Sequence, residues 1–143
     1  RGSSTLKTKK FLLYVDGGAR GNPGPAGIGV VILDARNRKV KEVYRYIGEA
    51  TNNIAEYSAL ICGLEEALSL SAGEIIVHMD SELIARQLTG EYRVKNTDLK
   101  ALFEKALEML KMFGSFEIKH IDRSRNKDAD KLVNKAINLA GLF

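Results

Sequence analysis

The chain has 143 residues, of which 45% are hydrophobic and 28% charged, which is ordinary for one globular domain with its own core. Its apolar runs are only a few residues long, so we expect no membrane-spanning segment. The formal net charge of +4 permits a polyanionic partner such as nucleic acid without requiring one.

The polar, lysine-containing start lacks the apolar stretch of a secretory signal peptide. We interpret residues 1–9 as an N-terminal tail, whose first four residues are typical of an expression-vector remnant, and residues 10–143 as a single domain. Cys62 is the only cysteine, which excludes an intrachain disulfide and fits a reducing compartment. We therefore expect a cytoplasmic protein.

The hydrophobic pattern predicts three strands followed by alternating helices and strands. The first strand, within KKFLLYVDGG, is a nearly continuous apolar run, which is typical of burial on both faces. Residues 26–50 are interpreted as two strands joined by a turn at residues 34–37. The later elements are expected at residues 52–71 (helix), 74–81 (strand), 81–90 (helix), 96–114 (helix), 115–122 (strand) and 126–143 (helix).

This order of elements predicts the fold class. Three consecutive strands favour an antiparallel meander, and the later strand–helix alternation favours crossovers to parallel strands. We expect an α/β fold with one five-stranded mixed sheet, three antiparallel strands and then two parallel ones, with helices on both faces.

Two aspartates follow apolar strands directly. Asp16 precedes four glycines and two prolines within ten residues, and Asp80 follows IIVHM. Ligands bind at the carboxyl ends of strands in parallel and mixed sheets. The alternatives are turn chemistry for Asp16 and an N-cap role for Asp80, which Ser81 would share.

Two further acids lie in the first turns of helices. With about 100° per residue, Glu56 falls on the inward side of its helix, in line with Leu60. A carboxylate there costs free energy unless it is paired, protonated or bound to a metal. The alternative is a capping box between Asn53 and Glu56 at a helix that opens with an Asn cap. Asp130 borders the apolar face of the last helix, where an acid also compensates the helix dipole.

If the two strands are neighbours, the four acids converge at one edge of the sheet. Carboxylates that share a small volume raise one another's pKa, and all-oxygen ligands favour Mg²⁺ or Mn²⁺ as the neutralising cation. Two such ions about 3.5–4 Å apart would activate a water and stabilise the leaving oxygen in phosphodiester cleavage. The alternative requires four independent capping or turn acids.

From about Lys10 to Leu139, the sequence resembles type 1 ribonuclease H. The resemblance rests on YVDGGARGNPGPAG, TNNIAEY, MDSELIARQL, VKN and NKDAD, in this order and approximate spacing. It implies a ribonuclease H-like fold and an endonuclease that hydrolyses the RNA strand of RNA/DNA hybrids, leaving 5′-phosphate and 3′-hydroxyl ends. It also implies two Mg²⁺ ions, with Mn²⁺ as a substitute. We expect a monomer, and cleavage of double-stranded RNA stays open.

The resemblance assigns roles to individual residues. It implies that Asp16, Glu56, Asp80 and Asp130 are the catalytic, metal-binding acids, and that Glu56 also contacts a ribose 2′-hydroxyl, the group that distinguishes RNA from DNA. The glycine-rich loop is implied to meet the minor groove, where narrow backbone approaches nucleic acid closely. The implied substrate contacts are Gly17, Gly18, Arg20, Asn22, Asn52, Asn53, Glu82, Lys95 and Asn96.

Two departures from the family pattern concern substrate binding. Glu82 stands where many members have Gln, which weakens the expected base contact. Some members have a basic helix and loop as a substrate handle, but here only TGEYR precedes VKN, so we expect a short form without that protrusion. Binding would then rely on Arg20, Arg86, Arg93, Lys95, and Arg123 or Arg125.

The third departure concerns a mobile histidine that assists catalysis in many members. His120 lies ten residues before Asp130, as in the family, but its surroundings, IKHIDRSRN, contain no glycine and predict a strand end. A structural role for His120 is therefore an equal alternative. Arg123 or Arg125 would take over part of the role, because a cation near a leaving phosphate stabilises charge. His120 and Arg123 complete the candidate catalytic residues.

Three other functions are alternatives for this sequence. Holliday-junction resolvases and integrase cores also cluster acids, but the Asn52–Asn53 pair and the GNPGPAG loop argue against them. A non-catalytic module that binds hybrids or double-stranded RNA would be marked by loss of an acid, and all four are present. An interaction domain of unspecific function would need all four acids to be coincidences.

Overall fold

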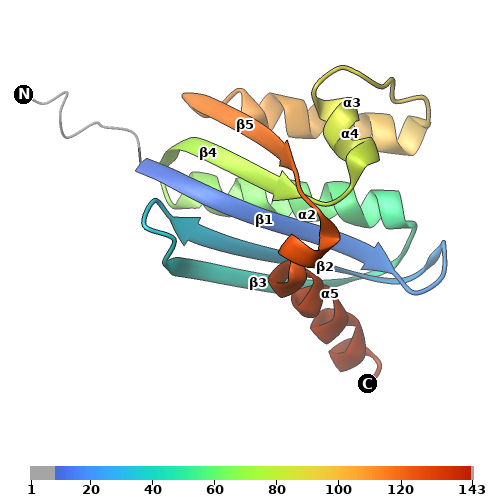
Figure 1. Ribbon diagram of the computed structural model, residues 1–143. Coiled ribbons are helices and arrows are strands. Elements are labelled where there is room, and N and C mark those ends of the chain that lie inside the picture. Colours follow the sequence, from blue (N-terminus) through green and yellow to red (C-terminus); the bar gives the residue numbers. More distant parts are fainter. Residues whose placement is uncertain (1–8, 143) are drawn as a thin grey trace, which may run out of the picture.

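One mixed sheet with the strand order β3-β2-β1-β4-β5 organises the protein in the computed structural model, which describes residues 9–142 (Figure 1). β1 pairs antiparallel with β2 and β2 with β3, whereas β1 with β4 and β4 with β5 are parallel. The predicted α/β fold is thus confirmed. The strands are β1 (Lys9–Ala19), β2 (Gly24–Asp34), β3 (Lys39–Ala50), β4 (Ala72–Met79) and β5 (Ser115–His120), and the helices are α2 (Asn52–Ser69), α3 (Glu82–Leu88), α4 (Thr97–Leu110), the 3-10 turn η1 (Arg123–Arg125) and α5 (Lys127–Ala140).

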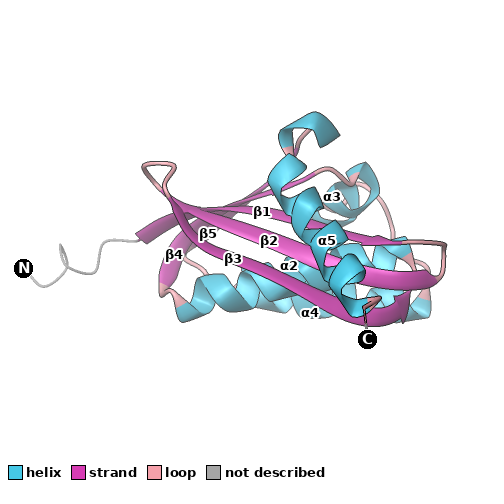
Figure 2. Ribbon diagram, turned by 90° about the horizontal axis from the view of Figure 1, so that it is seen from below, coloured by secondary structure: helices cyan, strands magenta, loops and turns pink. Residues whose placement is uncertain are grey.

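Helices cover both faces of the sheet (Figure 2). α2 packs on one face and is backed by α4, and α5 packs on the other face against β2 and β3. α5 approaches β2 closely because Gly29 has no side chain, and a Cβ atom there would overlap the carbonyl oxygen of Ala129. The core between the sheet and α2 includes Leu13, Val15, Ile28, Val30, Ile32, Tyr57, Leu60, Leu64, Ile75 and Val77.

The end of β1 corrects one prediction. β1 runs on to Ala19, so Asp16 lies inside the strand instead of ending it. The reason is that the hairpin with β2 continues to the pair Ala19–Ala26. Pairing with β4, however, stops at Tyr14–His78, so Asp16 lies just beyond the shared part of the two central strands.

The ends of the domain and the α3–α4 connection bear on two further predictions. β1 begins at Lys9, one residue before the expected domain start, and the rest of the predicted tail lies outside the described residues. Residues 89–96 join α3 to α4 without any helix or strand, in keeping with a short form. No helix within residues 9–142 has the length and apolar character needed to cross a lipid bilayer.

Candidate active site

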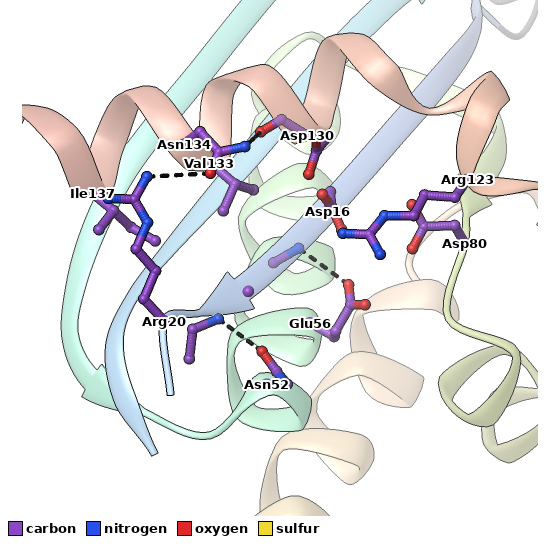
Figure 3. A pocket seen from close by; sticks show the side chains of 13 residues that line it. Asp16, Arg20, Asn52, Glu56, Asp80, Arg123, Asp130, Val133, Asn134 and Ile137 are labelled. Carbon is purple, nitrogen blue, oxygen red and sulfur yellow. Dashed lines mark hydrogen bonds between the residues drawn. The ribbon is translucent and has the colours of Figure 1, made fainter. Parts of the chain in front are cut away.

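A cavity of about 390 Å³ opens where β1, the end of β4, α2 and α5 meet. All four predicted acids line it, and Figure 3 shows their side chains around one common space with Arg123 reaching in among them. The other lining residues are Gly17, Gly18, Ala19, Arg20, Asn52, Val133, Asn134 and Ile137.

Sheet register places Asp16 and Asp80 side by side. The parallel pair Tyr14–His78 is the last between β1 and β4, and the two rings stack with centroids 4.2 Å apart. Asp16 and Asp80 each follow this pair by two residues, and side chains two apart in a strand share a face. Neighbouring strands therefore bring the two carboxylates together, as the sequence predicts.

Glu56 joins them from the first turns of α2. The helix meets β1 closely at Gly17, where a Cβ atom would overlap the carbonyl oxygen of Ala55. The Gly17 N–H donates to Glu56 Oε1 at 3.1 Å. One carboxylate oxygen each from Asp16, Glu56 and Asp80 lies within 4.8 Å of the others. Such a group of hard oxygen ligands fits a divalent cation.

Two capping alternatives for these acids are excluded by the observed helix starts. Thr51 is the N-cap of α2, and its Oγ1 accepts the Ile54 N–H at 3.2 Å, so the predicted Asn cap and capping box are wrong. Thr51 has the extended backbone that an N-cap needs, whereas Asn52 already belongs to the helix. Ser81 caps α3 by accepting the Ile84 N–H at 3.2 Å. Asp80 is therefore not needed as a cap.

Asp130 reaches the cavity from the first turn of α5 (Figure 3). It is not part of the three-acid group, but it lies close enough to Asp16 for its charge to raise the pKa of that residue. Asp16, Glu56 and Asp80 thus form a group with carboxylate oxygens within 4.8 Å of one another, and Asp130 lies beside Asp16.

The electrostatics of the cluster are unfavourable without a cation. Burial, followed by the charges of Asp80 and Asp130, raises the pKa of Asp16 to about 8. Burial, followed by Asp16 and Asp80, raises the pKa of Glu56 to about 9. Arg123 opposes both shifts, and the Gly17 N–H also opposes the shift of Glu56. Because these opposing contributions are the smaller ones, the pKa of both acids stays raised, and a bound cation would favour their charged forms.

Seven of the nine predicted substrate contacts divide between two hollows. Gly17, Gly18, Arg20 and Asn52 line the acid cavity. A second hollow of about 230 Å³ is lined by Asn22, Thr51, Asn53, Ile54, Asn96, Asp98 and Leu99.

Asparagines connect the two hollows. Asn52 Oδ1 accepts the Ala19 N–H at 2.8 Å, and Asn22 Oδ1 accepts the Asn52 N–H at 3.0 Å. The side chains of Asn22 and Asn52 therefore fasten the glycine-rich loop to the start of α2. Asn96 caps α4 by accepting the Leu99 N–H at 3.1 Å.

Six predicted residues lie outside these two hollows: Glu82, Arg86, Arg93, Lys95, His120 and Arg125. Glu82 forms an ion pair with Arg86 at 2.8 Å, and Lys95 lines neither hollow. His120 is the last residue of β5, as predicted, and lines a separate hollow of about 280 Å³ together with His78. The structure therefore brings Arg123 to the acids but does not bring His120 into their cavity.

Sequence reasoning missed Asn126 and Asn134. Asn126 is 1% exposed, and its Nδ2 donates to Asp80 Oδ2 at 3.1 Å. Asn134 lines the cavity and links Arg20, whose Nη2 donates to its Oδ1 at 3.2 Å, to the backbone oxygen of Asp130. The available signals were weak: Asn126 stands four residues before Asp130, at an expected helix start, and Asn134 four residues after it.

Comparison with known proteins gives a consistent family. A family model described as "Reverse transcriptase-like" matches residues 14–136. The chain is 43% identical over 132 residues to "Bifunctional protein Rv2228c" of Mycobacterium tuberculosis, covering 92% of this chain and 36% of that protein. It is 42% identical over 125 residues to "Ribonuclease HI" of Halobacterium salinarum, covering 87% and 63%. The chain thus spans less than two thirds of the length of these relatives.

Solved structures agree over nearly whole domains. The N-terminal RNase H domain of Rv2228c from Mycobacterium tuberculosis superposes with a TM-score of 0.91 at 41% identity, covering 94% of this chain and 98% of that one. LC11-RNase H1, solved in complex with an RNA/DNA hybrid, has a TM-score of 0.86 at 48% identity, covering 91% and 98%. The chain therefore belongs to the reverse-transcriptase-like family and, within it, to the type 1 ribonuclease H family that its sequence motifs resemble.

Proposed function

We propose that this chain is a metal-dependent endonuclease that hydrolyses the RNA strand of RNA/DNA hybrids, leaving 5′-phosphate and 3′-hydroxyl ends. The observation that carries the proposal is the group of Asp16, Glu56 and Asp80, with carboxylate oxygens within 4.8 Å of one another. The choice of an RNA/DNA hybrid as substrate is supported by a separate observation. The chain is 48% identical to LC11-RNase H1, whose structure was solved with an RNA/DNA hybrid.

Asp16, Glu56, Asp80 and Asp130 are the proposed ligands of two Mg²⁺ ions, for which Mn²⁺ can substitute. The raised pKa values of Asp16 and Glu56 support this assignment, because they reflect repulsion and burial that a divalent cation relieves. When bound, such ions polarise the phosphodiester and lower the pKa of the attacking water.

Other groups of the chain act on the substrate directly. Arg123, on the cavity wall, supplies positive charge where the bond between phosphorus and the 3′-oxygen breaks. We propose that Glu56 also accepts a hydrogen bond from a ribose 2′-hydroxyl, the contact that selects RNA. Gly17 and Gly18 line the cavity, and the partly exposed Gly18 has no side chain that would keep a nucleic-acid strand away.

The second hollow extends the polar surface beside the acids. Asn22, Asn53 and Asn96 line it, and we propose that they contact the duplex next to the cleaved strand. We also propose that Lys95, which directly precedes Asn96 but lines neither hollow, contacts a phosphate of the duplex. We further propose that the domain acts as a monomer, and the single, buried Cys62 supports a reducing, cytoplasmic setting.

A cleavage assay on one labelled RNA tests the proposal. The RNA is annealed to DNA, annealed to RNA, or left single, and incubated with Mg²⁺, Mn²⁺ or chelator and with wild type or Asp80→Asn. We expect metal-dependent cutting of the hybrid that the variant abolishes, and products that a phosphatase shifts in mobility because they carry 5′-phosphates. The RNA/RNA sample measures whether double-stranded RNA is also a substrate.

The other outcomes identify different functions. Binding of the hybrid without cutting under either metal would favour a non-catalytic binding module. Cutting that persists in Asp80→Asn would overturn the assignment of the acids. Neither binding nor cutting would overturn hybrid cleavage altogether.

A further inference from the structure

We infer that Asn126 is a positioning residue that holds the acids of the site in register, chiefly by fixing the Asp80 carboxylate against β1. The inference rests on the proposed function, because it concerns how this chain arranges the proposed metal ligands. It is carried by the contacts of one buried amide.

The Asn126 side chain joins the two central strands. Its Nδ2 donates to the Val15 carbonyl oxygen at 3.0 Å and to Asp80 Oδ2 at 3.1 Å. Val15 directly precedes Asp16, so one amide ties the Asp80 carboxylate to the backbone that carries Asp16. The bond occupies one oxygen of Asp80 and thereby restricts rotation of its carboxylate.

The backbone of Asn126 extends the link to α5. Its carbonyl oxygen accepts the Asp130 N–H at 3.1 Å, in the first turn of that helix. Asn126 therefore contacts Asp80 directly and is one hydrogen bond away from the segments that carry Asp16 and Asp130. No second residue is needed to connect these three acids.

Helix capping does not explain Asn126. Thr51, Ser81 and Asn96 precede their helices and accept an N–H with their side chains, whereas the Asn126 side chain makes no such bond to α5. Its Oδ1 is instead buried without a hydrogen-bond partner among the described residues. An unsatisfied buried acceptor is unfavourable. The side chain therefore adopts this orientation because of the two hydrogen bonds that its Nδ2 donates, although its Oδ1 is left without a partner.

The orientation of the amide follows from its neighbours. Both groups that face Nδ2 are oxygen acceptors, so a flipped amide would set Oδ1 against two oxygens. An amide donor is also suited to this place because it orients Asp80 without neutralising it. A lysine or arginine there would compete with a metal ion for the carboxylate.

Two substitutions of Asn126 and one control test the inference. Asn126→Ala removes the donor, and Asn126→Asp keeps the shape but replaces the donor with an acceptor. Gln87→Ala is the control, because Gln87 is also a buried amide but lies outside the acid cavity, where its Oε1 accepts the Tyr57 hydroxyl at 2.6 Å. Each protein is measured for Mn²⁺ affinity without substrate and for cleavage rate against Mg²⁺ concentration and against hybrid concentration.

We expect Asn126→Ala to raise the Mg²⁺ concentration for half-maximal rate, and to weaken Mn²⁺ binding, by roughly tenfold or more, as is typical when a partner of a metal ligand is lost. The KM for the hybrid should change little. Asn126→Asp should be worse than Asn126→Ala, because it adds a carboxylate beside Asp80. Gln87→Ala should lower thermal stability, because it leaves the buried Tyr57 hydroxyl without its acceptor, and it should leave metal dependence unchanged.

Two results would overturn the positioning role. One is an Asn126→Ala protein that is less stable but has wild-type metal dependence. The other is an Asn126→Asp protein closer to wild type than Asn126→Ala, because that order indicates that only the space is needed. If Asn126→Ala does not fold, Asn126→Leu, which fills a similar space without a donor, takes its place with the same expected direction. A wild type that binds Mn²⁺ but does not cleave would refute the proposed function, and the Mn²⁺ affinities would still decide the role of Asn126.

Discussion

Asp16 lies inside β1 and Asp34 ends the neighbouring strand β2, yet the surroundings of the two carboxylates are opposite. Asp34 accepts hydrogen bonds from the backbone N–H groups of Arg36 and Arg38 and from Arg38 Nε, at 2.9–3.0 Å. These bonds, that of the Arg38 backbone first, lower the pKa of Asp34. Asp16 is buried and faces other acids, and its pKa is raised to about 8.

The difference separates a turn residue from a ligand. At Asp34 the turn itself supplies the donors that a carboxylate needs, so its charge is satisfied within the protein. At Asp16 the neighbours are Asp80, Asp130 and Glu56, and Arg123 offsets only part of their repulsion. A buried carboxylate whose repulsion by other acids is only partly offset indicates a ligand-binding site, here for a cation.

The largest expected difference is in catalysis. Asp16→Asn should reduce the rate of hybrid cleavage by more than about a hundredfold. Removing a proposed metal ligand should cost more activity than removing a residue that only hydrogen-bonds to a ligand. Asp34→Asn should leave the rate unchanged within error. Single-turnover rates with Mg²⁺ measure both, and equal rates for the two variants would remove the distinction.

Arg123 tests the partial neutralisation of the acids. Arg123→Ala should slow cleavage by roughly tenfold, since it removes a cation from the cavity wall. The loss should be larger near pH 7 than near pH 9, because Arg123 holds down the pKa values of Asp16 and Glu56. Arg36→Ala, a change in the turn beside Asp34, is the control. A pH-independent loss would contradict this role of Arg123.

A smaller effect is expected at His120. Because it lines a hollow separate from the acids, His120→Ala should change the cleavage rate only a few-fold, on the scale of surface substitutions away from such a site. Measured beside Asp16→Asn, a loss as large as that of the acid would show that His120 moves into the site during the reaction.

Without metal, the acid cluster and Asp34 should make the stability of the folded protein depend on pH in opposite directions. The folded-state pKa values of Asp16 and Glu56 lie above their ordinary values of 3.8 and 4.5, so the folded state binds more protons and these groups destabilise it progressively as pH rises to about 9. The lowered pKa of Asp34 gives stability above its ordinary pKa that is lost as pH falls.

Thermal unfolding in chelator, from about pH 3 to pH 9, checks this sign. Glu56→Gln should flatten the decline at the alkaline side, and Asp34→Asn should flatten the decline at the acid side. If Glu56→Gln has the same alkaline decline as wild type, the acid cluster is not its cause.

Much of the fold and the four acids follow from the sequence because they depend on local pattern. Strand and helix periods predict the element order, and Asp16 and Asp80 stand out because they directly follow apolar runs. Parallel pairing of β1 and β4 then makes their convergence a matter of topology.

The remaining features depend on contacts between distant residues. Asn126 joins segments more than a hundred residues apart in the chain, through its bond to Val15, and no local pattern indicates that partner. The predicted Asn cap of α2 is wrong because several adjacent polar residues fit the sequence pattern of a cap. The extended backbone at Thr51, which the sequence does not show, decides which of them caps the helix. The separation of His120 from the acids likewise follows from where β5 ends relative to η1.

Metal-linked stability tests the central claim, that the acid cluster is a cation site, most directly. The midpoint of thermal unfolding is measured at pH 8, at constant ionic strength, with Mn²⁺ or with chelator, for wild type, Asp34→Asn and Asp16→Asn. A ligand that binds the folded state raises its stability, so Mn²⁺ should raise the midpoint of wild type and Asp34→Asn by the same amount and that of Asp16→Asn by much less. An equal rise in all three proteins, or no rise in wild type, would contradict a cation site at Asp16.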